Sequence, residues 1–103
     1  MLEITKVTDK NNVLIKVKGR IDTDNASNLA SALQESVSRT TNEVLVLDCE
    51  ELQYMSSAGL RLLLQTRKQV GENRFKLINV TDVLKEILVV TGFDSFLKIE
   101  YKI

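Results

Sequence analysis

Two adjacent serines, Ser56 and Ser57, stand just before a run of leucines in the stretch YMSSAGLRLLL. A serine can cap a helix by accepting a hydrogen bond from a backbone N–H, or its hydroxyl can receive a phosphate. A helix start has unpaired N–H groups and a positive partial charge, so it tolerates a phosphate. Ala58 and Gly59 are small and keep the loop tip flat for a partner, and Gly59 lets the backbone pack closely behind the loop. Capping explains one serine and leaves the other open as a phosphoacceptor.

A second polar group, Asp22, Thr23 and Asp24, precedes a segment with helical periodicity. One interpretation is that Thr23 or Asp24 caps that helix and that the acidic residues favour its dipole. The alternative is partner binding, in which an acidic residue beside a phosphorylatable serine binds a basic residue or a metal-nucleotide of the partner. Arg61 follows Ser57 closely and is either part of a solvated face or a contact of the same site.

Other chemistry finds little support in the composition. The 103 residues contain no histidine, so neither a Ser-His-Asp nor a Cys-His arrangement can form, and a zinc site lacks its usual ligands. The spacing around the serines does not match the G-x-S-x-G nucleophile motif. We therefore expect no enzyme activity, no metal site and no cofactor. Cys49 is the only cysteine, and we expect it to be a buried small apolar residue.

The charge balance bears on the partner. Lys and Arg together number 14, as do Asp and Glu, so the formal net charge is zero. Binding to nucleic acid or to an anionic membrane surface usually leaves a basic excess, and we expect neither partner. The first residues, MLEITKVTDK, lack the apolar core of a signal peptide, and no apolar run approaches the ~20 residues of a membrane span. We expect a soluble cytoplasmic protein.

The elements that must position these residues alternate along the chain. Period-two or continuous apolar patterns predict strands at residues 2–7, 13–19, 43–49, 74–80 and 96–103. Helical periodicity predicts three helices, within residues 20–40, 58–73 and 81–92. We interpret residues 50–57 as a loop. Gly71 and Gly92 are expected at helix C-termini and Thr81 at a helix N-terminus.

The order ββαβαβαβ predicts an α/β fold. Strands that alternate with helices form parallel pairs through right-handed crossovers, and the first two strands are expected to form a hairpin. The prediction is a mostly parallel sheet of about five strands with an antiparallel N-terminal edge strand and with Val44–Asp48 at its centre. Residues 1–103 fit one domain. We expect Leu47, Leu60, Leu63 and Leu64 in its core.

The combination of motifs resembles the bacterial anti-sigma factor antagonists, the STAS-domain family. The resemblance rests on VKGRIDTDNA, VLVLDCEELQYMSSAGLRLLL and TGFDSFLKI and covers essentially the whole chain. It implies that Ser57 is the phosphoacceptor, that Gly59 is the family glycine, and that Asp22 is the acidic residue of the Gly-x-hydrophobic-Asp turn. Two positions depart from the family pattern: Ser56 replaces a common aspartate, and Ala58 replaces a Ser or Thr. With Ser57 as the acceptor, Ser56 is expected to be chiefly a cap or spacer.

The resemblance also implies a function by partner switching. The unphosphorylated protein would bind an anti-sigma factor and so release a sigma factor. The anti-sigma factor, commonly a serine kinase, would phosphorylate Ser57, and the complex would then dissociate. A phosphatase would remove the phosphate and restore the binding form. Partner contacts are expected at the following residues: Asp22, Thr23, Ser56, Ala58, Gly59 and Arg61. The alternative is a STAS-fold accessory or scaffold subunit of a transporter or signalling assembly.

Overall fold

The computed structural model describes residues 2–9, 11–39 and 42–103, and within them six strands and three helices. The strands are β1 (Leu2–Thr8), β2 (Asn12–Ile21), β3 (Val44–Asp48), β4 (Leu52–Met55), β5 (Phe75–Val80) and β6 (Lys98–Tyr101). The helices are α1 (Ala26–Arg39), α2 (Ser57–Val70) and α3 (Asp82–Thr91), with single 3-10 turns at Glu72–Arg74 and Phe93–Ser95. The predicted order of elements is confirmed, with one strand added.

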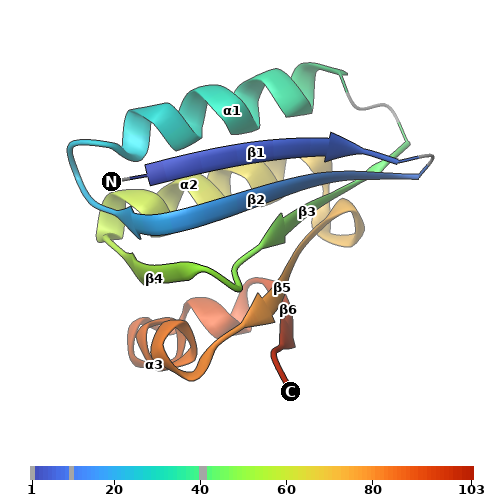
Figure 1. Cartoon of the computed structure of the whole chain (residues 1–103). Helices are drawn as coiled ribbons and strands as arrows, with labels where there is room; N and C mark the ends of the chain where they lie inside the picture. Colours follow the sequence, from blue (N-terminus) through green and yellow to red (C-terminus); the bar gives the residue numbers. More distant parts are fainter. Residues whose placement is uncertain (1, 10, 40–41) are drawn as a thin grey trace.

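All six strands form one sheet (Figure 1). The order across it is β1-β2-β3-β5-β6, so β3 is central as predicted. The β1–β2 pair is antiparallel and every other pair is parallel. β2 is long enough to take two neighbours on one side: its first half pairs with β3 and its last residues, Gly19–Ile21, pair with β4. Together these pairings confirm the mostly parallel α/β sheet.

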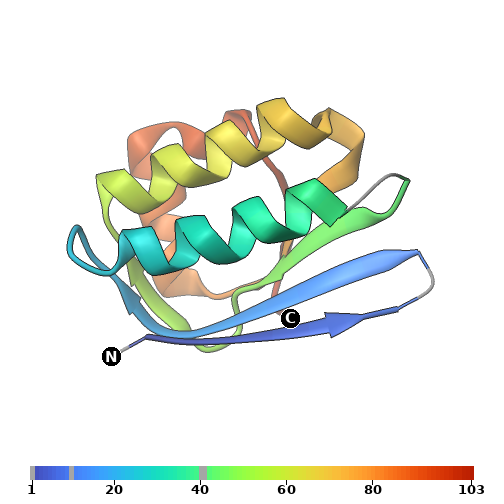
Figure 2. The ribbon, with the colours of Figure 1, turned by 90° about the horizontal axis from the view of Figure 1, so that it is seen from above.

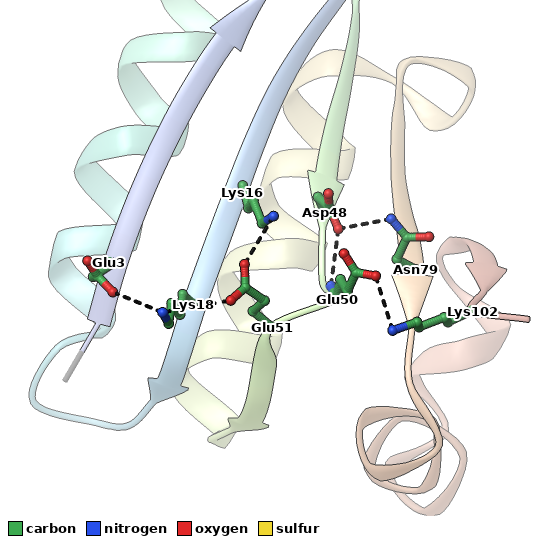
Figure 3. Close-up of polar contacts among 8 residues, drawn as sticks. All are labelled: Glu3, Lys16, Lys18, Asp48, Glu50, Glu51, Asn79 and Lys102. Atoms are coloured by element: carbon green, nitrogen blue, oxygen red, sulfur yellow. Dashed lines mark hydrogen bonds and ion pairs between the residues drawn. The ribbon is translucent and has the colours of Figure 1, made fainter.

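The helices α1 and α2 run side by side in the same direction over one face of the sheet (Figure 2). No helix among the described residues covers the opposite face of the sheet (Figure 3). The helix α3 packs against β4 at the end of the sheet where β2 and β4 finish. The core lies under the helices, and Leu47, Leu60 and Leu63 are buried in it as predicted. Leu64 is only half-buried, so its predicted core position is wrong. Leu62 packs against the core on the same helix.

The stretch predicted as a loop contains β4, which is the main difference from the sequence prediction. Its pairing with β2 is irregular: Gly19 is opposite Leu52, whereas Arg20 is opposite Tyr54, so Gln53 is an extra residue. Gly19 adopts a positive φ of 112° at this point. The extra residue interrupts the alternation of buried and exposed side chains, and that alternation is the sequence signal for a strand.

The predicted helix ends are partly confirmed. Thr81 is the N-cap residue of α3 and Gly92 its C-cap, with the left-handed φ of 79° that favours glycine. Gly71 is the C-cap of α2. The prediction that Thr23 or Asp24 caps α1 is wrong. The hydrogen bonds that cap the start of this helix are made by Asp22, whose side chain and backbone bond to Asn25 and Ala26.

Candidate functional site

The two serines have different surroundings at the start of α2. Ser56 is the N-cap residue and is 8% exposed, and its Oγ accepts a 3.3 Å hydrogen bond from the backbone N–H of Gly59. Ser57 is the first residue of α2 and is exposed. The capping hydroxyl is therefore occupied and buried, whereas the Ser57 hydroxyl is accessible. The prediction that Ser56 is a cap is confirmed by this geometry.

Gly59 is needed because the backbone of α2 passes close to the sheet. A Cβ at this position would lie 2.6 Å from Cγ of Met55 and 2.9 Å from Cγ2 of Ile21, both of which are buried. Ala58 is half-buried and packs against the core. The small residues after the serines therefore seat the first turn of α2 directly on β2 and β4. This confirms the close approach expected of Gly59.

The turn after β2 is built around Asp22. Its backbone N–H donates to Oδ1 of Asn25, and the N–H of Asn25 donates back to Oδ1 of Asp22, both at 2.8 Å. The N–H of Ala26 also donates to the carbonyl oxygen of Asp22 at 3.1 Å. This reciprocal pair is a form of capping box. The sequence analysis missed Asn25, although its spacing of three from Asp22 is the signal for such a box.

The pairing of β2 with β4 brings the two loops to one edge of the sheet. Ile21 and Met55 are opposite each other at the strand ends, and the residues that follow them are Asp22 and Ser56. The N–H of Ser56 donates to the carbonyl oxygen of Ile21 at 2.8 Å. Parallel strands place their carboxyl ends together, and sites in open α/β sheets tend to form there. Arg61, four residues after Ser57 on α2, is exposed.

The first turn of α2 contains no acidic residue. The N–H groups at a helix start point outward without helical partners, and the partial positive charge there is not offset by a carboxylate of that turn. A phosphate on Ser57 would meet these N–H groups, and Arg61 lies one helical turn away. The arrangement can therefore hold a covalently attached anion without disturbing the buried cap.

The helix-free face of the sheet carries a network of ion pairs next to this edge (Figure 3). Lys16 Nζ lies 3.0 Å from Glu51 Oε1, while Lys18 Nζ lies 3.8 Å from Glu51 and 3.9 Å from Glu3. The hydrogen bond to Glu51 raises the pKa of Lys16, and the same bond lowers the pKa of Glu51. These lysines are therefore occupied by carboxylates of the same chain.

The connection from β3 to β4 is fixed by Asp48. Its Oδ1 accepts hydrogen bonds from the N–H of Glu50 and from Nδ2 of Asn79, both at 3.1 Å. Asn79 has a φ of 54°, a left-handed conformation that asparagine tolerates better than most residues. Glu50 in turn lies 3.1 Å from Lys102 Nζ (Figure 3). These contacts hold the residues that lead into β4 and so to the two serines.

A further contact near the edge was not predicted from the sequence. The guanidinium carbon of Arg20 lies 4.6 Å from the centre of the Tyr54 ring, which is a cation–π distance. The two residues are opposite each other on β2 and β4. The pair could not be predicted from the sequence, because the pattern of residues 50–57, which include Tyr54, indicates a loop.

Metal and membrane sites receive no support from the described residues. Among residues 2–9, 11–39 and 42–103, no group of three or more His, Cys, Asp or Glu side chains could hold a metal ion. No helix in the described part of the chain is long and apolar enough to cross a membrane. Cys49 is fully buried, as predicted, and its burial raises the pKa of the thiol.

Comparison with known proteins places the whole chain in one family. The STAS domain model matches residues 3–103. The protein BtrV of Bordetella bronchiseptica, described as an anti-sigma factor antagonist, is 32% identical over 81 residues, which cover 77% of this chain and 69% of BtrV. The family model and this relative together show the family of the chain.

Solved structures show the same fold. The crystal structure of an anti-sigma factor antagonist from Mycobacterium paratuberculosis has a TM-score of 0.87 at 21% identity, covering 97% of this chain and 86% of that one. The Bacillus cell fate determinant SpoIIAA in its phosphorylated form has a TM-score of 0.66 at 17% identity, covering 99% and 93%. At such low identity these structures establish the fold alone.

Proposed function

Because the chain belongs to the STAS domain family of anti-sigma factor antagonists, we propose that it is a partner-switching module gated by phosphorylation of Ser57. In the unphosphorylated state it binds an anti-sigma factor, and a sigma factor is released. The anti-sigma factor is itself the serine kinase that phosphorylates Ser57, and a phosphatase restores the binding form. The chain has no catalytic role of its own in this scheme, and it acts in the cytoplasm as a single domain.

The observation that carries the proposal is the contrast between the two serines. Ser56 is buried and its Oγ is hydrogen-bonded, so a kinase cannot reach it without opening the helix start. Ser57 is exposed at the N-terminus of α2, where a phosphate finds outward N–H groups. The structural likeness to a phosphorylated form of SpoIIAA supports the view that this fold accommodates such a group.

The switch follows from the change in charge. A phosphoserine adds about −1.5 to −2 charges at neutral pH. The start of α2 stabilises that charge within the chain, so the fold changes little. A partner surface shaped around a neutral hydroxyl would instead bury an unpaired anion, which typically costs several kcal/mol. Since each 1.4 kcal/mol is a factor of ten in affinity, a weakening of about a hundredfold or more follows.

The remaining predicted contacts surround Ser57. Asp22 and Thr23 lie in the turn tied to the serine loop, and Ala58 and Gly59 form the first turn of α2 with Ser56 as its cap. We assign Asp22, Thr23, Ala58 and Arg61 to the surface that the anti-sigma factor covers, whereas the buried Ser56 and Gly59 hold the backbone of that surface in place. Asp22 would contribute a charge to that surface, and Gly59 would contribute its shape.

The test begins by recovering the anti-sigma factor with a tagged form of the chain from its native host and producing it as a recombinant protein. The purified chain is then incubated with that kinase and ATP, and the phosphate is mapped by mass spectrometry. We expect one phosphate, on Ser57, which disappears in Ser57→Ala. Ser27→Ala is the matched control, because Ser27 is also an exposed serine in the first turn of a helix.

Phosphate on Ser56 alone would move the switch by one residue and contradict the assignment to Ser57. No phosphate on either serine with a kinase shown to be active would overturn the phosphorylation switch. Recovery of a transporter or signalling complex in place of an anti-sigma factor would favour the scaffold alternative.

A further inference from the structure

The contact between Arg20 and Tyr54 differs from the other cation contacts near the edge. Lys16, Lys18 and Lys102 are each paired with a carboxylate of the same chain (Figure 3). Among the described residues, Arg20 makes no ion pair, and its guanidinium stacks 4.6 Å from the Tyr54 ring. An aromatic ring occupies the flat face of a guanidinium but leaves the N–H groups on its rim able to donate.

The stacking also limits the freedom of an otherwise exposed side chain. Arg20 is exposed, whereas Tyr54 is half-buried and comes from the opposite strand. A guanidinium held on a ring loses less conformational entropy when it forms hydrogen bonds than a free one does. Its planar fork matches a carboxylate in two parallel hydrogen bonds. Arg20 therefore has the features of a preorganised anion contact.

The position of Arg20 links it to the proposed switch. Its carbonyl oxygen accepts a 2.9 Å hydrogen bond from Nδ2 of Asn25, in the turn that contains Asp22. The next residue, Ile21, accepts the hydrogen bond from the N–H of Ser56. The backbone of Arg20 and Ile21 is thus hydrogen-bonded to both loops. Ile21 is buried beneath the first turn of α2, so the alternation of side chains along β2 places Arg20 on the helix-free face. Ser57 begins the helix on the other face, so the two residues lie on different sides of the same edge.

We propose that Arg20, held by Tyr54, is a specificity-determining contact that receives a carboxylate of the anti-sigma factor. The inference rests on the function proposed above and extends the binding surface around the edge from the start of α2 to the helix-free face of the sheet. The carboxylate would accept two hydrogen bonds from the guanidinium fork. No covalent change at Arg20 is involved.

The local charge supports a carboxylate as the group that Arg20 receives. The glutamates of the ion-pair network, Glu3, Glu50 and Glu51, are each paired with a lysine. The guanidinium of Arg20 is paired with none of them, so its charge is left for a carboxylate of a partner. A phosphate on Ser57 is the other anion available. It would lie at the start of α2 with Arg61 one turn away, which makes Arg61 its nearer partner.

The test measures the affinity of the recombinant anti-sigma factor from the kinase experiment for variants of the chain, by calorimetry without ATP. We expect Arg20→Ala to weaken binding about tenfold or more, as arginine contacts at interface centres often do. Arg20→Lys keeps the charge but loses the planar fork, and it should weaken binding as well. Tyr54→Phe keeps the ring and should bind within about twofold of the natural sequence.

Lys18→Ala is the matched control. Lys18 lies on the same strand, two residues from Arg20, and its variant removes the same formal charge, but from a lysine already paired with carboxylates. We expect its affinity to stay within about twofold. The affinity of the natural sequence should also fall more steeply with added salt than that of Arg20→Ala, since salt screens the contact. Thermal unfolding of each variant checks that the fold is retained.

Equal affinities of Arg20→Ala and Lys18→Ala would overturn the inference and leave the phosphorylation switch intact. Stronger weakening of binding by Arg20→Ala in the phosphorylated chain than in the unphosphorylated one would reassign Arg20 to the phosphate and also contradict it. A different measurement would show that the proposed function itself is wrong. In that case Ser57→Asp, measured in the same series, would bind as tightly as the natural sequence.

Discussion

The backbone N–H of Ser56 donates a 2.8 Å hydrogen bond to the carbonyl oxygen of Ile21. This single contact joins the serine loop to the end of β2, one residue before Asp22. The two groups that the sequence marks as candidates for chemistry are therefore neighbours in the structure, although more than thirty residues separate them along the chain.

Ser57 should act as the switch without supporting the fold. Ser57→Ala should bind the anti-sigma factor constitutively, in the presence of the kinase and ATP, because no phosphate can be added. Ser57→Asp should remain folded, because an acidic residue in the first turn favours the helix dipole, yet bind more weakly. Thermal unfolding and calorimetric titration measure the two properties separately. A Ser57→Asp variant that unfolds early would show that the site cannot hold an anion.

Asp22 should contribute both a cap and a charge, and two substitutions separate them. Asp22→Ala removes the acceptor for the N–H of Asn25 and should lower the free energy of unfolding by about 1 kcal/mol. Asp22→Asn keeps a side-chain oxygen as acceptor, so its stability should change less. Both should weaken binding of the anti-sigma factor if the charge contacts the partner. Normal binding by Asp22→Asn would reduce Asp22 to a capping residue.

Leu63 and Leu64 are adjacent on α2 but differ in burial. Leu63 is fully buried, and Leu63→Ala should cost about 2–5 kcal/mol of unfolding free energy through lost burial and the cavity left behind. Leu64 is half-buried, so Leu64→Ala should cost clearly less. Chemical denaturation of the two variants under identical conditions gives the comparison. Equal costs would mean that the face of α2 turned to the core is wrongly assigned.

Gly59→Ala should destabilise the chain, against the usual direction for a helix. Alanine normally gains about 1 kcal/mol over glycine inside a helix. Here the added methyl group would meet Cγ of Met55 at 2.6 Å and Cγ2 of Ile21 at 2.9 Å in a packed core, and overpacking typically costs about 1–3 kcal/mol. A lower denaturation midpoint for Gly59→Ala than for the natural sequence would confirm the prediction. A more stable variant would show that α2 can move away from the sheet at no cost.

Cys49 should be unreactive in the folded chain. Burial raises the pKa of its thiol, with a smaller contribution from the Asp48 carboxylate, so the thiolate fraction near pH 8 is very low. The sulfur is also shielded from reagents because the residue is fully buried. Alkylation followed by intact-mass measurement should show no modification in buffer and complete modification in denaturant. Rapid modification of the native chain at pH 8 would contradict the buried position.

The sequence allowed the fold to be predicted where its patterns are regular. The run from Val44 to Asp48 and the helical spacing of Leu29 and Leu33 led to the correct strand and helix. The strand β4 could not be predicted, because the extra residue Gln53 breaks the alternation and a partner strand stabilises it. A strand that is stabilised by pairing with a distant segment, and whose own residues do not alternate regularly, cannot be predicted from its local sequence pattern.

The candidate site also contains features that could be predicted from the sequence and features that could not. The capping role of Ser56 and the close approach at Gly59 follow from residue type and spacing, and both are confirmed. The cap of α1 was assigned to Thr23 or Asp24, since either is a good capping residue, yet the reciprocal bonds between Asp22 and Asn25 determine it. The contact between Arg20 and Tyr54 depends on β4, so it was out of reach once that strand was missed.

The sharing of β2 among three strands sets the order in which the chain can assemble. β1 joins it through a short connection, and hairpins of this kind form within microseconds. β4 can join only after the chain has passed through α1 and β3, and pairings between distant segments form slowly. The turn at Asp22 and the loop at Ser56 thus meet late in folding. A partly folded chain that has not yet docked β4 lacks this edge, so under the proposed function an anti-sigma factor would recognise only molecules that have completed this step.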